Sequence, residues 1–135
     1  MGDVSSKGIA YGNLGNDYQN LGDLEKAIHY HERSLEIARR VGNVSSEGSA
    51  YGNLGNDYQN LGNFIKAKHY HERQVEIAKK AGHKISIGAG FHNLGVDFQS
   101  MGLLGKAVDC YQHSIATLND VRRHLVKMLL RRNGV

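Results

Sequence analysis

Eight histidines give this chain its most obvious capacity for chemistry, because imidazole nitrogens bind metal ions and exchange protons near neutral pH. Four of them form two pairs, His29 with His31 and His69 with His71. On a helix, residues two apart point about 200° away from each other, whereas metal ligands on one helical face need steps of three or four. We therefore interpret these histidines as structural, and we predict no metal site and no cofactor.

Cys110 and His113 are the one pair with the residue types and spacing of a nucleophile and its base. They would lie within reach of each other on a helix. No third group that could orient the histidine accompanies them, so the pair lacks the usual catalytic constellation. Apolar neighbours at helical spacing (Val108, Tyr111 and Ile115) favour a small buried thiol instead. We predict that the chain is not an enzyme.

A repeat that covers most of the chain determines where such residues stand. Residues 11–22 and 51–62 both read YGNLGNDYQNLG, and residues 91–102 read FHNLGVDFQSMG, an offset of 40 residues each time. A fixed period of this size is typical of solenoids, in which each unit buries its apolar face only against its neighbours. The sequence therefore predicts an extended surface rather than a pocket, and a binding protein rather than a catalyst.

Each unit is predicted to form two helices joined by a short turn. In the first unit, apolar side chains recur at steps of three and four, at Tyr11, Leu14, Tyr18 and Leu21. Gly22 ends this helix, and Asp23 can cap the next helix, which ends before Gly42. Leu103 of the third unit offers no capping side chain. Glycine inside a helix indicates a close neighbour, and we expect Gly15 to pack against Ala27.

Charge and cysteine content limit the classes of function. The net charge is +4, and before residue 120 acidic and basic residues balance, twelve of each, so that the excess lies in residues 120–135. A nucleic-acid partner would depend on this tail alone, and we do not expect one. No signal peptide and no apolar run near the ~18 residues of a membrane span is present. A single cysteine fits a reducing compartment, so we expect a cytoplasmic protein.

The repeated residues resemble the tetratricopeptide repeat (TPR) consensus, which places an aromatic, Leu, Gly, Tyr, Gly and Ala in this order. The matching positions are Tyr11, Leu14, Gly15, Tyr18, Gly22 and Ala27, then Tyr51, Leu54, Gly55, Tyr58, Gly62 and Ala67, then Phe91, Leu94, Gly95, Phe98, Gly102 and Ala107. The period of 40 rather than 34 resembles the repeats of the G-protein-signalling modulators (the Pins/LGN group) and of large multi-TPR relatives. The resemblance implies a scaffold that holds extended peptide segments of partners in a concave groove.

On this basis we expect one all-α domain, residues 1–135, folded as a right-handed α-α superhelix. Three helix-turn-helix repeats would occupy residues 3–42, 43–82 and 83–118, followed by a C-terminal capping helix at 119–132. The apolar stripe of that helix, Leu118, Val121, Leu125, Met128 and Leu129, would cover the last repeat. Its alternatives are a helix that lies on anionic lipid and a helix that binds a partner, and a homodimer could form through this end. The chain could also be a slice of a longer array.

The resemblance also implies that the first helices of successive units line the groove. The expected peptide-binding residues are mostly amides: Asn13, Asn16, Gln19, Asn20, Asn53, Asn56, Gln59, Asn60, His92, Asn93 and Gln99. Because an amide offers both a donor and an acceptor, this ladder suits the main chain of an extended peptide. The alternative is that these side chains solvate an exposed face or bond to a neighbouring helix. No basic residue is expected there, which disfavours a clamp for a C-terminal carboxylate.

The sequence therefore predicts a non-catalytic protein–protein interaction scaffold that binds an extended peptide segment. A second hypothesis is a structural module that self-associates through its array ends or its C-terminal helix. A third is that the basic tail tethers the module to an anionic membrane or to RNA, which steep salt dependence would reveal.

Overall fold

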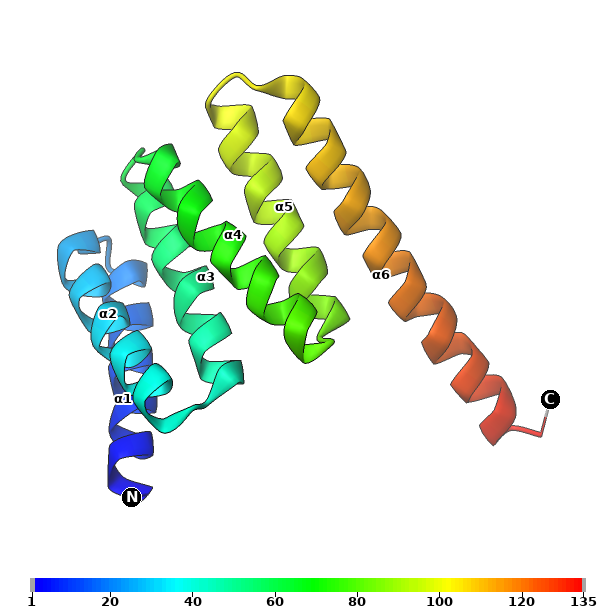
Figure 1. Cartoon of the computed structure of the whole chain (residues 1–135), viewed down its shortest axis with the longest axis horizontal. Helices are drawn as coiled ribbons and strands as arrows, with labels where there is room; N and C mark the ends of the chain where they lie inside the picture. The colour runs from blue at the N-terminus through cyan, green and yellow to red at the C-terminus, as the bar shows by residue number, and fades with distance from the viewer. Residues whose placement is uncertain (1, 135) are drawn as a thin grey trace.

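The computed structural model describes residues 2–134 and consists of six α-helices, with no β-strand among these residues (Figure 1). The helices are α1 (Gly2–Asn20), α2 (Leu24–Val41), α3 (Val44–Asn60), α4 (Phe64–Ala81), α5 (Lys84–Ser100) and α6 (Leu104–Arg132). They pair as α1 with α2, α3 with α4 and α5 with α6, so that each pair contains one copy of the repeat.

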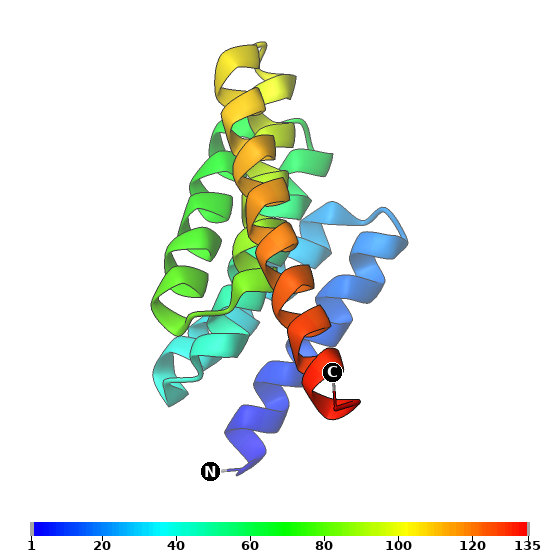
Figure 2. The same cartoon turned by 90° about the vertical axis from the view of Figure 1, so that its right-hand side faces the viewer.

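Each helix packs against its neighbours in the chain, and the first helices of successive units also touch, α1 with α3 and α3 with α5. The three helix pairs follow one another from left to right in Figure 1. Figure 2 looks onto the end of this stack, where α6 lies in front. The predicted all-α solenoid is confirmed.

Local sequence explains the turns within each unit. The chain leaves the first helices through residues with φ near +80°, a region that favours glycine, at Gly22, Gly62 and Gly102. Asp23 then caps α2, because its side chain accepts a hydrogen bond from the backbone N–H of Lys26 at 3.2 Å. As predicted, Leu103 provides no side-chain cap for α6.

The C-terminal segment differs from the prediction. Residues 119–132 are helical, but they continue α6 as one helix of 29 residues and do not fold back as a separate capping helix. Gly42 and Gly82 end α2 and α4 with φ of 70° and 69°, whereas the third unit has Arg122 at the equivalent position. Without a residue that favours the left-handed conformation, the helix continues. Side chains from Arg122 to Leu130 are therefore exposed, and the last unit stays uncovered within the described residues (Figure 2).

The apolar core lies where one unit meets the next. The α2–α3 joint buries Leu35, Ala50, Tyr51 and Leu54, with Ile28, Tyr70 and Ile77 packed around them. The α4–α5 joint is built around Val75, Leu94 and Cys110, with Phe91 and Phe98 beside them. The units thus stabilise one another mainly across these two joints.

Candidate functional site

An uncharged hollow lies between α1 and α3 and has a volume of about 190 Å³. Apart from Ile9, small and polar side chains line it: Gly12, Asn13, Asn16, Ser34, Ser45, Ser46, Ser49, Ala50 and Asn53. Of the predicted peptide-binding residues, the structure therefore brings Asn13, Asn16 and Asn53 together. Gly12 lets α1 pack closely on α2, since a Cβ there would lie 3.3 Å from the Ser34 hydroxyl oxygen, and the small serines leave room for a main chain to approach.

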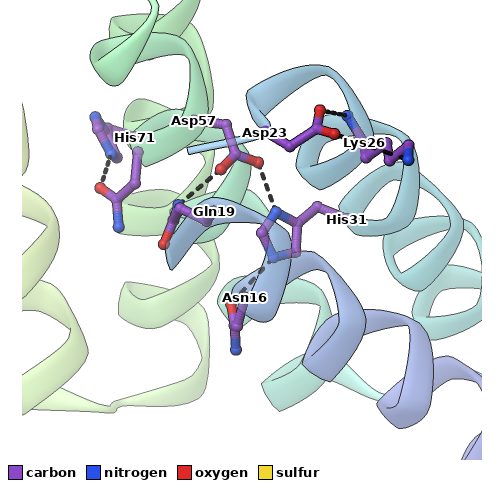
Figure 3. A network of polar contacts seen from close by, with 8 residues as sticks. Asn16, Gln19, Asp23, Lys26, His31, Asp57 and His71 are labelled. Carbon is purple, nitrogen blue, oxygen red and sulfur yellow. Dashed lines mark hydrogen bonds and ion pairs between the residues drawn. The ribbon is translucent and has the colours of Figure 1, made fainter. Parts of the chain in front are cut away.

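A buried polar network (Figure 3) adjoins this hollow, because Asn16 belongs to both. His31 of α2 and Asp57 of α3 are both fully buried, and His31 Nδ1 lies 2.5 Å from Asp57 Oδ2. Gln19 Nε2 donates a hydrogen bond of 2.7 Å to the other carboxylate oxygen, Oδ1. On the far side of the imidazole ring, Nε2 lies 3.0 Å from Oδ1 of Asn16. Because these four residues come from α1, α2 and α3, the network ties the first unit to the second.

The same network recurs 40 residues later. His71 Nδ1 lies 2.5 Å from Asp97 Oδ2, and Gln59 Nε2 donates to Asp97 Oδ1 at 2.9 Å. His71 Nε2 lies 3.1 Å from Asn56 Oδ1. Burial of a carboxylate is costly unless the charge is paired and hydrogen-bonded, and here both oxygens of each aspartate have a partner. The predicted structural role of His31 and His71 therefore has a specific form, a polar bond between units. We call these two clusters the inter-unit networks.

The inter-unit networks separate the predicted amides into two kinds. Gln19 and Gln59 hold the buried aspartates, so their principal contacts are within the protein. Asn16 and Asn56 use only their oxygen atoms toward histidine, and the nitrogen of Asn16 points away from the ring (Figure 3). Among the side-chain hydrogen bonds of residues 2–134, none involves Asn13.

The remaining predicted residues lie outside the α1–α3 hollow. Asn20 and Asn60 are exposed in the last turns of α1 and α3. His92 lies beside Tyr111, with ring centroids 5.6 Å apart, and Gln99 accepts a hydrogen bond of 2.7 Å from the Tyr111 hydroxyl. Asn93 is half-buried on α5.

Sequence reasoning missed Asp57 and Asp97, the residues that complete the networks. Both lie at the repeated position that Asp17 occupies in the first unit, in helices with few other acidic residues. A carboxylate repeated in register with a repeated histidine was the available signal, although the separation of 26 positions between His31 and Asp57 hides their contact.

Close approach to the histidine rings explains the glycines inside the first helices. A Cβ atom at Gly15 or Gly55 would overlap the ring of His31 or His71. The predicted contact of Gly15 with Ala27 is therefore wrong as to partner, because the nearest group is His31. In the third unit Gly95 faces the ring of Tyr111, which replaces the histidine there.

The structure gives Cys110 and His113 no joint role. Burial, followed by the nearby charge of Asp109, raises the pKa of the Cys110 thiol, which disfavours the reactive thiolate. The His113 ring stacks on Phe91, with centroids 4.9 Å apart. Residues 2–134 contain no group of three or more His, Cys, Asp or Glu side chains placed to hold a metal ion.

Helical pairs joined in register by apolar contacts and buried polar networks define a helical-repeat protein. The family model described as "Tetratricopeptide repeat" matches residues 6–80 and, in a second overlapping alignment, residues 46–120. The chain therefore belongs to the tetratricopeptide repeat family, whose domains generally mediate protein–protein interactions. None of the helices described between residues 2 and 134 has the length and apolar character that a membrane crossing requires.

Solved structures agree with this fold. The TPR domain of Arabidopsis FLU superposes with a TM-score of 0.82 at 24% identity, over 87% of this chain and 98% of that one. The N-terminal domain of stress-induced protein-1 from C. elegans gives 0.74 at 23% identity, over 95% of both chains. BtubC from P. vanneervenii gives 0.80 at 23% identity, over 85% of this chain and 48% of its own. No curated protein matches the chain in sequence.

Proposed function

We propose that this chain is a non-catalytic scaffold that binds an extended peptide segment along the first helices of its units. The α1–α3 hollow is the observation that carries the proposal, because its amides are available to a ligand and no charged side chain lines it. An extended peptide presents alternating N–H and C=O groups, and an asparagine amide can form a hydrogen bond with either.

The inter-unit networks support this role by orienting part of the surface. Contact with His31 holds the oxygen of Asn16, so that its amide nitrogen is free to donate toward the hollow. In the second unit His71 Nε2 holds the oxygen of Asn56 in the same way, although Asn56 does not line the α1–α3 hollow. A ligand therefore meets side chains that are already ordered, which lowers the entropic cost of binding.

The 40-residue period and the repeated sequence support the proposal that this chain is an adaptor similar to the Pins/LGN group and acts in the cytoplasm. In this proposal the partner is a protein segment with few charges, because no lysine or arginine lines the hollow to hold an acidic tail.

A binding experiment with matched variants tests the proposal. The groove variant carries Asn13→Ala, Asn53→Ala and Asn93→Ala. The control carries Gln112→Ala, Asn119→Ala and Asn133→Ala, which removes three exposed amides from α6 and its end. Partners captured by the wild-type chain from cell extract are identified by crosslinking and mass spectrometry, and their segments are then synthesised as peptides.

The groove variant should bind such a peptide about 100-fold more weakly, at about 1 kcal/mol for each lost hydrogen bond, and the control should bind normally. Equal binding by both variants would show that the groove is not the peptide site. Circular dichroism checks that the three proteins are equally helical.

The exposed end of α6 favours a second candidate function, attachment to an anionic lipid surface. Apolar side chains at Leu125, Met128 and Leu129 are more than half exposed beside the basic residues of this segment, Arg122, Arg123, Lys127, Arg131 and Arg132. Sedimentation with phosphatidylserine vesicles should pull the chain down at low salt and lose it steeply as salt rises. Absence of binding at low salt would exclude this function.

A further inference from the structure

The two internal joints follow one pattern, and the chain carries both halves of that pattern again on its outer faces. In each joint a second helix supplies an apolar residue and a histidine, while the next first helix supplies a leucine and an aspartate. The α2–α3 joint uses Leu35 and His31 against Leu54 and Asp57. The α4–α5 joint uses Val75 and His71 against Leu94 and Asp97.

We call the outer side of α1 the head face, defined by Ala10, Leu14 and Asp17. These residues are the counterparts of Ala50, Leu54 and Asp57. Leu14 and Asp17 lie in the twelve-residue sequence that is identical in the two units. Leu54 is 0% exposed, whereas Leu14 is 40% exposed. Asp57 is fully buried and Asp17 is exposed. The head face thus has the residues against which a second helix packs in the internal joints, but no second helix of residues 2–134 lies on it.

We call the outer side of α6 the tail face, defined by Leu104, Val108, Tyr111 and Ile115. Ile115 stands where Leu35 and Val75 stand in the internal joints, and it is 60% exposed, against 9% and 6% for those two residues. Within residues 2–134 no helix covers α6 on this side (Figure 2). The exposed apolar residues of the tail face are the kind that the internal joints bury.

Polar groups on the two faces also match. Tyr111 replaces the histidine, and its hydroxyl donates to Gln99 Oε1, which leaves Gln99 Nε2 free to donate. In the internal joints the equivalent Gln19 Nε2 donates to Asp57. The exposed carboxylate of Asp17 is the corresponding acceptor on the head face.

Two missing contacts make this pairing weaker than an internal joint. The Tyr111 hydroxyl donates to Gln99, so it does not make the direct contact that the His31 ring makes with Asp57. The ion pair between Arg39 and Glu47, with 3.7 Å between Nε and Oε2, is replaced at the equivalent positions by Asn119 and Lys7, which neither attract nor repel strongly. A contact of this strength would be reversible.

We propose that the tail face of one chain binds the head face of a second copy, in the register of the internal joints. The proposal is independent of peptide binding in the hollow. Such a contact is heterologous, so every dimer retains one free head face and one free tail face, and assembly continues as concentration rises. The second copy would bury Leu14 against Ile115 and place Gln99 beside Asp17.

Sedimentation velocity of the 135-residue chain from about 1 µM to about 200 µM, a range that covers weak reversible interfaces, tests the proposal. Two single variants each block one face, Leu14→Glu and Ile115→Glu, and both sites are exposed, so the fold should tolerate them. Leu21→Glu is the matched control, because Leu21 is 79% exposed and its counterpart Leu61 remains 52% exposed inside a joint.

The wild type and the Leu21→Glu control should grow in mean mass with concentration. Each blocking variant alone should stay monomeric, with an apparent dissociation constant raised about tenfold or more by the buried charge. An equimolar mixture of the two blocking variants should form dimers and nothing larger, since it contains one intact head face and one intact tail face.

Three results would overturn the proposal. If the wild type stays monomeric over the whole range, the head face and the tail face do not bind each other and are available to other partners. Loss of assembly in Ile115→Glu together with normal assembly in Leu14→Glu would instead indicate a symmetric contact between two α6 helices. A mixture of blocking variants that stays monomeric would show that the two faces do not bind each other.

Discussion

Leu14 and Leu54 stand in identical twelve-residue sequences, and this allows the contribution of a neighbouring unit to be measured directly. Both residues lie at the same place in a first helix, so helix propensity and local contacts are equal. They differ in that α2 packs on the outer side of α3, whereas the outer side of α1 has no neighbour among residues 2–134. Leu14→Ala and Leu54→Ala therefore form a matched pair.

The expected costs follow from the exposed fractions. Replacing leucine by alanine removes three carbons, worth about 2.4 kcal/mol in transfer free energy at about 0.8 kcal/mol each when they are fully buried. At the 0%-exposed Leu54 a residual cavity adds to this, giving about 3–5 kcal/mol. At the 40%-exposed Leu14 about three fifths of the transfer term remains, about 1.4 kcal/mol, with little cavity. The two variants should differ by about 2 kcal/mol.

Urea unfolding followed by circular dichroism at low protein concentration measures both costs. Adding Ile115→Glu to both proteins prevents any contact between copies from stabilising the Leu14 variant. With an m-value of about 2 kcal/mol/M, the midpoints should differ by about 1 M urea. Equal midpoints would refute the reasoning, because the cost would then depend on the local sequence and not on the neighbouring unit.

Three further predictions concern the networks and the thiol. Gly55→Ala should lower the free energy of unfolding by about 2 kcal/mol or more, because the new Cβ would overlap the ring of His71, and hydrogen bonds hold that ring in place. An unchanged midpoint of urea unfolding would contradict this. Asp57→Asn should cost about 3 kcal/mol, since it removes the buried carboxylate that contacts His31 and accepts from Gln19, whereas Asp17→Asn at the exposed equivalent should change stability by less than about 0.5 kcal/mol. Similar effects of both would argue against the network. Because burial raises the pKa of the Cys110 thiol, the thiolate forms less readily in the folded protein, and iodoacetamide at pH 8 should label it more slowly than in urea-unfolded protein; equal rates would show an open thiol.

The sequence was sufficient to predict the helices and their turns because these depend on neighbouring residues. Gly22 and Asp23 act on groups within a few positions, so their roles can be read without knowledge of the rest of the fold. The end of α6 could also have been predicted in this way. Arg122 stands where Gly42 and Gly82 stand, but the expected capping helix was taken from the behaviour of similar arrays rather than from this residue.

The site was predicted only in part, because its polar contacts join residues far apart in the chain. Asn13 and Asn53 line the α1–α3 hollow, and the resemblance to TPR arrays implied their place on the first helices. The contact between His31 and Asp57 depends on how α2 lies against α3, and spacing along one helix carries no information on that. Gln19 looked equivalent to Asn13 for the same reason, although its amide is used to hold Asp57.

The inter-unit networks also link two properties that would otherwise be independent. Asn16 belongs to the hollow, and through His31 it is one hydrogen bond away from the carboxylate that holds the second unit to the first. A ligand that pulls on the Asn16 amide therefore changes the free energy of the joint, and by reciprocity any force that alters the angle between units changes the affinity for the ligand. The second network repeats this connection through Asn56. If a segment binds as proposed, it would therefore also set the curvature of the array, and bending of the array would change how tightly the segment is held.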